Sequence, residues 1–116
     1  MPALENYLRT YRRRTGLSQA DAAFLAGLST KAVVHRHERS VRLPDLRIAI
    51  AYEKLYNTPV SEIFAGIAEK VERNIRDRSQ MLARQLADAK GRHPARKRAT
   101  LALLAPRAAT LSITDA

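Results

Sequence analysis

The amino-acid sequence predicts an all-α protein, and three features of its pattern lead to this prediction. Residues 18–38 favour two short helices joined by a tight turn. Residues that start or stop helices recur along the chain, for example Gly16, Pro44 and Asn57. Over residues 60–86, apolar side chains recur in steps of three and four, as they do on one face of a long helix.

Composition limits the class of protein. The chain has 116 residues, enough for one small domain with a tail, and it contains no cysteine, which excludes disulfides and thiolate metal sites. No apolar run is long enough to span a bilayer, and the N-terminus lacks the order of a signal peptide, so we expect a cytoplasmic protein without a membrane partner. The formal charge is +10, which favours a polyanionic partner, most often nucleic acid.

The first predicted helix covers Ala3–Thr15. Leu4, Leu8 and Tyr11 fall at helical spacing on one side of it. Its outer side is basic and solvated, and it carries Arg9, Arg12, Arg13 and Arg14. Gly16 ends this helix, because glycine adopts a positive φ without a Cβ clash.

The next two helices form the most informative part of the sequence. Ser18 followed by Asp21 is a capping-box pattern, and the alanines that follow favour a helix that a neighbour can approach closely. Gly27 ends this helix, and Ser29 or Thr30 caps a further one that runs to about Arg39. Two helices around a turn that contains glycine are the signature of a helix-turn-helix, whose second helix enters the DNA major groove.

The helix at about 30–39 has two different sides. At about 100° per residue, its apolar stripe consists of Thr30, Val34, His37 and Val41. The opposite side is basic and small, and it consists of Lys31, Ala32, His35, Arg36 and Arg39. We expect the helix to dock through Val34, which leaves the basic side outward.

The rest of the chain predicts one more short helix, one long helix and a tail. Pro44 at the first helical position and Asp45 as a cap open a helix that Asn57 closes, and Thr58-Pro59 opens the next. We therefore expect a DNA-binding domain at 1–66, an extended helix at 67–87 and a basic, flexible tail at 88–116, with a break at Lys90–Pro94 and a short helix near Ala95–Ala105.

The long helix carries more apolar residues than the small domain can cover. Val71, Ile75, Leu82 and Leu86 form a stripe that approximates a heptad, with Arg78 at one core-like position. An exposed stripe of this kind predicts the contact of a homodimer. The alternative is that the tail folds back and covers the stripe with Leu101, Leu103 and Leu104.

Three segments of the sequence resemble the phage-repressor-like, or XRE, helix-turn-helix family. They are LRTYRRRTGLSQADAAFLAGLS, VHRHERSVRLPDL and PVSEIFAG, and the resemblance covers about residues 4–66. It implies a lambda-repressor-like domain of five helices that docks as a dimer on double-stranded DNA, and a sequence-specific regulator of transcription. The family usually has glycine where this chain has Ser40, and this chain has one extra residue between Gly27 and Val34.

The resemblance also assigns roles to residues. It implies that Gln19 bonds a DNA phosphate, that Arg12 pairs with Glu38, and that base edges are read by Ser29, Thr30, Lys31 and Ala32, with His35 further along. Arg36, Arg39 and Arg42 surround the same helix, and we expect them to contact DNA, mostly through its backbone.

Other classes of function are less well supported by the sequence. His35 and His37 lie two residues apart and point to different faces of a helix, so no metal site is expected, and no cofactor is implied. No nucleophile lies in a pattern with a base, so we expect no enzyme. The alternatives to a regulator are an antitoxin that holds a small-protein partner, an RNA-binding helical module, and a fragment of a DNA-modifying enzyme.

Overall fold

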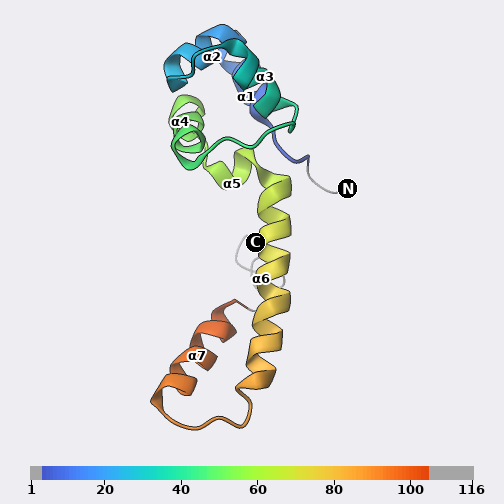
Figure 1. Cartoon of the computed structure of the whole chain (residues 1–116), viewed down its shortest axis with the longest axis vertical. Coiled ribbons are helices and arrows are strands. Elements are labelled where there is room, and N and C mark those ends of the chain that lie inside the picture. The colour runs from blue at the N-terminus through green and yellow to red at the C-terminus, as the bar shows by residue number, and fades with distance from the viewer. Residues whose placement is uncertain (1–3, 105–116) are drawn as a thin grey trace, which may run out of the picture. The chain divides into compact units, whose positions relative to one another are not determined.

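The computed structural model describes residues 4–104, which form seven α-helices (Figure 1). The chain divides into two compact units between Lys70 and Val71. Within the described residues, no helix is both long and apolar enough to cross a bilayer. The all-α class predicted from the sequence is confirmed.

The first unit contains the helix-turn-helix. Its helices are α1 (Leu8–Thr15), α2 (Gln19–Ala26), α3 (Lys31–Glu38), α4 (Leu46–Tyr56), α5 (Val60–Ile63) and the beginning of α6 (Ala65–Gln85). Gly16 and Gly27 end α1 and α2 at φ 79° and 78°, as their positions in the sequence predicted. The helix expected at about 30–39 is α3, and Thr30 occupies its N-cap position.

The capping box of α2 is confirmed in both directions. The Ser18 hydroxyl accepts a hydrogen bond from the Asp21 backbone N–H at 3.0 Å, and the Asp21 carboxylate accepts one from the Ser18 N–H at 3.0 Å. The bond from the Ser18 N–H lowers the pKa of Asp21, because it favours the charged carboxylate. Local sequence therefore specifies where α2 begins.

α1 begins at Leu8, so the prediction of a helix from Ala3 was wrong. Over the described part of this segment, tertiary hydrogen bonds replace helical ones: Tyr7 N–H donates to the Ile63 carbonyl at 2.7 Å, and Gly66 N–H donates to the Leu4 carbonyl at 2.9 Å. Asn6 accepts from Leu8 N–H and donates to the His37 carbonyl and the Ser40 hydroxyl. Residues 4–7 are thus fastened to α3, α5 and α6.

Two apolar clusters hold the unit together. The larger one consists of Leu8, Tyr52, Tyr56, Ile63 and Phe64. The smaller one consists of Ala22, Ala23 and Val34, where the small alanine side chains allow α2 and α3 to approach each other. Val34 is buried as predicted, whereas Thr30 is exposed and Val41 is 69% exposed. Because α3 ends at Glu38, Val41 lies in a loop and cannot extend the helical stripe.

The turns around α3 and α4 differ in detail from expectation. Ser40, at the position where the family usually has glycine, has φ 59°, so the left-handed backbone is kept without a glycine. Asp45 is the N-cap of α4 and accepts from Ile48 N–H at 2.9 Å, so Pro44 precedes the helix and does not occupy its first position. Pro59 likewise occupies the N-cap position of α5, so this helix begins at Val60, one residue later than predicted.

The helix expected to run without a break from Val60 to about Leu86 is interrupted. α5 ends at Ile63, Phe64 has φ −108° and ψ 49°, and α6 begins at Ala65. This non-helical backbone accompanies a Phe64 side chain that is buried in the larger cluster. Gly66 lies inside α6, directly after the break.

In the second unit the chain turns after α6 and returns as α7 (Arg92–Leu103), beside the C-terminal half of α6 (Figure 1). α7 begins before the predicted Ala95, because Pro94 lies in the first helical turn, where a missing N–H breaks no helical bond. Arg98 fastens it by donating to the Leu86 carbonyl at 2.7 Å and to the Ala89 carbonyl. Ala105 and the later residues of the expected tail lie outside the described residues.

α7 leaves most of the apolar stripe of α6 exposed, while Leu86 at its end is half-buried. A cavity of about 450 Å³ between the two helices is lined by Ser79, Ala83 and Ala87 of the α6 side and by Leu101 of α7, among others. Val71, Ile75 and Leu82 lie on another side of α6 and are 49%, 44% and 41% exposed. Leu103 and Leu104 of the tail also stay partly exposed, at 65% and 38%. The tail thus returns along α6, as that alternative expected, and Leu101 and Leu86 are half-buried, but within the described residues Val71, Ile75 and Leu82 stay exposed. The choice between a second copy and the tail as the cover of this stripe stays a prediction.

Candidate nucleic-acid interface

α3 presents a continuous basic face to solvent. At about 100° per residue its exposed side chains share an arc of about 140°. They are Lys31, Ala32, His35, Arg36 and Arg39, the last at the C-cap position. Val34 and His37 are buried on the other side, at 1% and 3% exposure. The outer side is the one that the sequence predicted, whereas of the predicted inner stripe only Val34 and His37 are buried.

The remaining predicted site residues flank this face. Ser29 and Thr30 are exposed in the turn before α3, and Arg42 is exposed in the loop that follows it. Gln19 is the first residue of α2 and is half-buried. The predicted residues are thus gathered from the start of α2, from α3 and from its two adjoining turns.

Arg12 and Glu38 form a buried ion pair, as the resemblance implied. Arg12 Nε lies 2.6 Å from Glu38 Oε2, a second guanidinium nitrogen donates to Oε1 at 3.1 Å, and the two side chains are 12% and 3% exposed. The hydrogen bond to Glu38 raises the pKa of Arg12 above its ordinary value. Arg12 also donates to the Leu17 carbonyl at 3.0 Å, so the pair joins α1, the turn before α2, and α3.

Gln19 has contacts that the sequence did not suggest. Its Nε2 donates to Glu38 Oε1 at 3.1 Å and lies 3.3 Å from His35 Nδ1. The amide therefore connects the ion pair beneath α3 to the exposed imidazole on its outer face. Such a pairing of residues 16 apart leaves no periodic signal in a single sequence.

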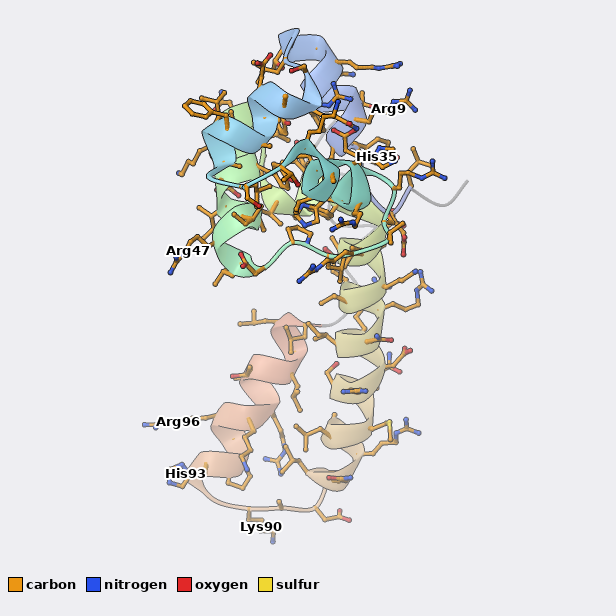
Figure 2. All side chains as sticks on the ribbon, turned by 45° about the horizontal axis from the view of Figure 1, so that its top comes forward. Arg9, His35, Arg47, Lys90, His93 and Arg96 are labelled. Carbon is orange, nitrogen blue, oxygen red and sulfur yellow. The ribbon has the colours of Figure 1, made fainter. Side chains whose placement is uncertain are left out.

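An open polar cleft of about 450 Å³ separates α1 from the ends of α2 and α3. Arg9, Arg12, Gln19, His35, Glu38 and Arg39 line it. Figure 2 labels Arg9 and His35, which lie on the same side of the domain. Arg9 was interpreted from the sequence only as part of a solvated basic side. Its position three residues before Arg12, on the same side of α1, was the signal that could have identified it.

His37 has a structural partner. Its Nδ1 lies 2.7 Å from the Tyr52 hydroxyl, and the two rings meet edge to face. Burial lowers the pKa of His37, assisted by the charge of Arg42, and burial raises the pKa of Tyr52. The neutral imidazole and the protonated phenol therefore share one buried hydrogen bond. Among the described residues, no group of three His, Asp or Glu side chains could hold a metal ion.

Comparison with known proteins agrees with this geometry. Residues 8–63 match a family described as helix-turn-helix. Neither curated proteins nor solved structures gave a match to the chain. The matched segment begins at the first residue of α1 and ends at the last residue of α5, so it contains α3 and the buried ion pair beneath it. Residues 8–63, slightly under half of the chain, thus match a helix-turn-helix family and form an XRE-like helix-turn-helix DNA-binding domain, and the all-α structure is consistent with the lambda-repressor-like fold.

Proposed function

We propose that this protein is a sequence-specific regulator of transcription that binds double-stranded DNA and performs no catalysis. The observation that carries the proposal is the exposed face of α3, where three basic side chains and His35 share one arc above a docked apolar side. A short helix held in this way can enter the major groove while it stays packed on the domain.

The exposed residues divide by the contacts that their chemistry allows. Ser29, Thr30, Lys31 and Ala32 lie at the end of α3 that leads into the groove, where hydroxyls and an ammonium read base edges and a methyl group contacts thymine. Arg36, Arg39 and Arg42 lie toward the other end, where guanidinium groups bind phosphates and fix the register of the domain without reading bases. Gln19, from the start of α2, borders the same surface.

Selection of bound sequences from a random duplex pool tests this function. We expect a defined motif, and we expect Lys31→Ala to change the preferred base pairs, with ~1–3 kcal/mol less discrimination if the contact is good. Arg42→Ala is the matched control, because removal of a phosphate-binding side chain weakens all duplexes alike. Binding without any preferred motif, or a preference for RNA over duplex DNA in competition, would contradict the proposal.

We also propose that the protein acts as a homodimer through the α6 stripe of Val71, Ile75 and Leu82. These three apolar side chains are between 41% and 49% exposed, and burial against the same stripe of a second copy would remove them from water. A two-fold pair of chains suits the symmetry of operators, whose half-sites lie about one DNA turn, or ~34 Å, apart.

Light scattering at micromolar concentration tests the dimer. The double variant Val71→Asp, Ile75→Asp should be monomeric, because it places charges in the proposed contact. Arg73→Asp, on the opposite side of α6, is the control and should remain dimeric. The proposal fails if the wild-type chain is monomeric, or if the double variant is folded and still dimeric. Co-purification of a second small protein would support an antitoxin instead, which would hold that partner through its tail.

A further inference from the structure

A chain of polar contacts leads from the buried ion pair to the outer face of α3. Arg12 donates to Glu38, Gln19 Nε2 donates to Glu38 Oε1 at 3.1 Å, and the same nitrogen lies 3.3 Å from His35 Nδ1. Glu38 is 3% exposed and α3 is anchored through it, whereas His35 is exposed. The contacts therefore couple a rigid buried group to a side chain on the proposed reading surface.

The donor in each contact follows from the chemistry of Glu38. A carboxylate paired with arginine accepts hydrogen bonds and donates none, so the –NH₂ end of the Gln19 amide must face Glu38. The second hydrogen on that nitrogen is then available to His35, and the imidazole nitrogen at 3.3 Å can only accept it. A neutral imidazole that accepts at Nδ1 carries its proton on Nε2.

We propose that Gln19 is a positioning residue that holds His35 in the Nε2–H tautomer, and that His35 reads a base-edge acceptor in the major groove through this N–H. The inference rests on the proposed DNA-binding function and assigns the specificity of one part of its surface. The acceptors that such a donor can address are guanine N7 and O6, adenine N7 and thymine O4.

This role differs from the phosphate contact that the family resemblance implied for Gln19. Its amide nitrogen lies 3.1 Å from Glu38 Oε1 and 3.3 Å from His35 Nδ1, so a phosphate that took one of its hydrogens would replace one of these two contacts. Fixing the imidazole before DNA arrives also reduces the entropy that His35 loses on binding. Removing Gln19 should therefore act on the base pair that His35 reads, and not on every duplex equally.

The first test compares motifs selected by four chains: wild type, Gln19→Met, His35→Ala and the double variant. Methionine keeps the length of the side chain and removes both donors. We expect Gln19→Met and His35→Ala to reduce the preference at the same base pair by about ten-fold, and the double variant to reduce it no further than either. Lys31→Ala is the matched control and should alter a different base pair.

The outcomes separate this inference from the function beneath it. A wild-type chain that selects no motif refutes the proposed function itself. A wild-type motif that Gln19→Met leaves intact at the His35 position overturns only the inference. Uniform weakening of all duplexes by Gln19→Met also overturns it, and leaves Gln19 as a phosphate contact.

A second readout observes the imidazole directly in the free protein. Nitrogen-15 NMR of the His35 ring should show an unprotonated Nδ1 and a protonated Nε2 in the wild-type chain at mildly basic pH. In Gln19→Met the two nitrogen shifts should move toward the average of the two tautomers, because the constraint on Nδ1 is gone. Unchanged shifts in a folded Gln19→Met protein would contradict the positioning role.

Discussion

The buried Glu38 carboxylate accepts hydrogen bonds from two side chains, those of Arg12 and Gln19. A charge that is 3% exposed has lost most of its hydration, and these hydrogen bonds compensate for that loss only while both partners are in place. The ion pair therefore fixes how α1 and α3 are arranged, whereas its net contribution to the free energy of unfolding is small.

Glu38→Ala should lower the free energy of unfolding by ~3–5 kcal/mol, because it leaves the Arg12 cation buried without its partner. The matched control is Glu5→Ala, which removes the exposed pair of Glu5 and Lys70 at 3.6 Å and should cost less than ~1 kcal/mol. Urea unfolding of both variants measures the two values. Equal small losses would mean that the Arg12 charge reaches water in the native state.

Two neighbouring tyrosines should respond in opposite ways to loss of their hydroxyl groups. The Tyr52 hydroxyl is hydrogen-bonded to His37 Nδ1, so Tyr52→Phe should cost ~1–3 kcal/mol by leaving a buried imidazole nitrogen unpaired. The Tyr56 hydroxyl is buried without a hydrogen-bond partner among the described residues, and burial raises the pKa of Tyr56 to about 12. Tyr56→Phe should therefore be neutral or stabilising by up to ~1 kcal/mol. If thermal melts showed the same loss of stability in Tyr52→Phe and in Tyr56→Phe, this predicted difference would be wrong.

Acid should destabilise the domain through His37. Burial lowers the pKa of His37 below its ordinary value of 6.5. As the pH falls below 6.5, His37 is therefore protonated in the unfolded chain before it is protonated in the folded chain. This contribution to stability is complete above that pH and is lost as the pH falls. Urea unfolding at a series of pH values should show the slope in wild type and in His93→Gln, and a smaller slope in His37→Gln.

At the scale of elements, the helices begin where local caps place them, except where a distant segment competes. Gly66 shows this competition most clearly. A Cβ at this position would lie 2.5 Å from the Leu4 carbonyl oxygen and 2.8 Å from Glu5 Cα. Leu4 and Glu5 can therefore pack against α6 only because residue 66 has no side chain.

Gly66→Ala should therefore destabilise the domain, although the same change in an open helix stabilises by ~1 kcal/mol through backbone entropy. The clash is with backbone atoms, so relief requires the segment before α1 to move away from α6. Ala68→Gly is the control inside the same helix, and it should show the ordinary helix-propensity loss. Thermal melts of the two variants decide the sign, and a stabilised Gly66→Ala would show that this segment is not held on α6.

At the scale of the whole molecule, charge should dominate affinity for DNA. If ~6–10 phosphates are neutralised by a dimer, binding should weaken ~10³-fold or more between about 50 mM and about 200 mM salt. Arg39→Gln, Arg42→Gln should reduce the slope of this dependence by ~0.9 for each phosphate that is no longer neutralised. Arg96→Gln, Lys97→Gln in α7 is the control. An equal reduction there would mean that the C-terminal unit binds phosphates as well.

The sequence by itself determined the features that depend on residues within one or two helical turns of one another. The capping box of Ser18 and Asp21, the left-handed Gly16 and Gly27, and the outward basic face of α3 are all of this kind, because a side chain meets its neighbours at fixed helical spacings. The family resemblance added the Arg12–Glu38 pair, which joins residues 26 apart and which no periodicity reveals.

Tertiary structure alone decided where distant segments replace local preference. The start of α1 at Leu8, the break at Phe64 and the bond from Gln19 toward His35 each depend on a partner that lies far along the chain. One residue prefers the helical state by only a few tenths of a kcal/mol. A hydrogen bond or a buried ring that reaches a distant partner contributes at least as much free energy. Local pattern is therefore a reliable guide inside a helix and a poor one at its ends, where packing determines the structure.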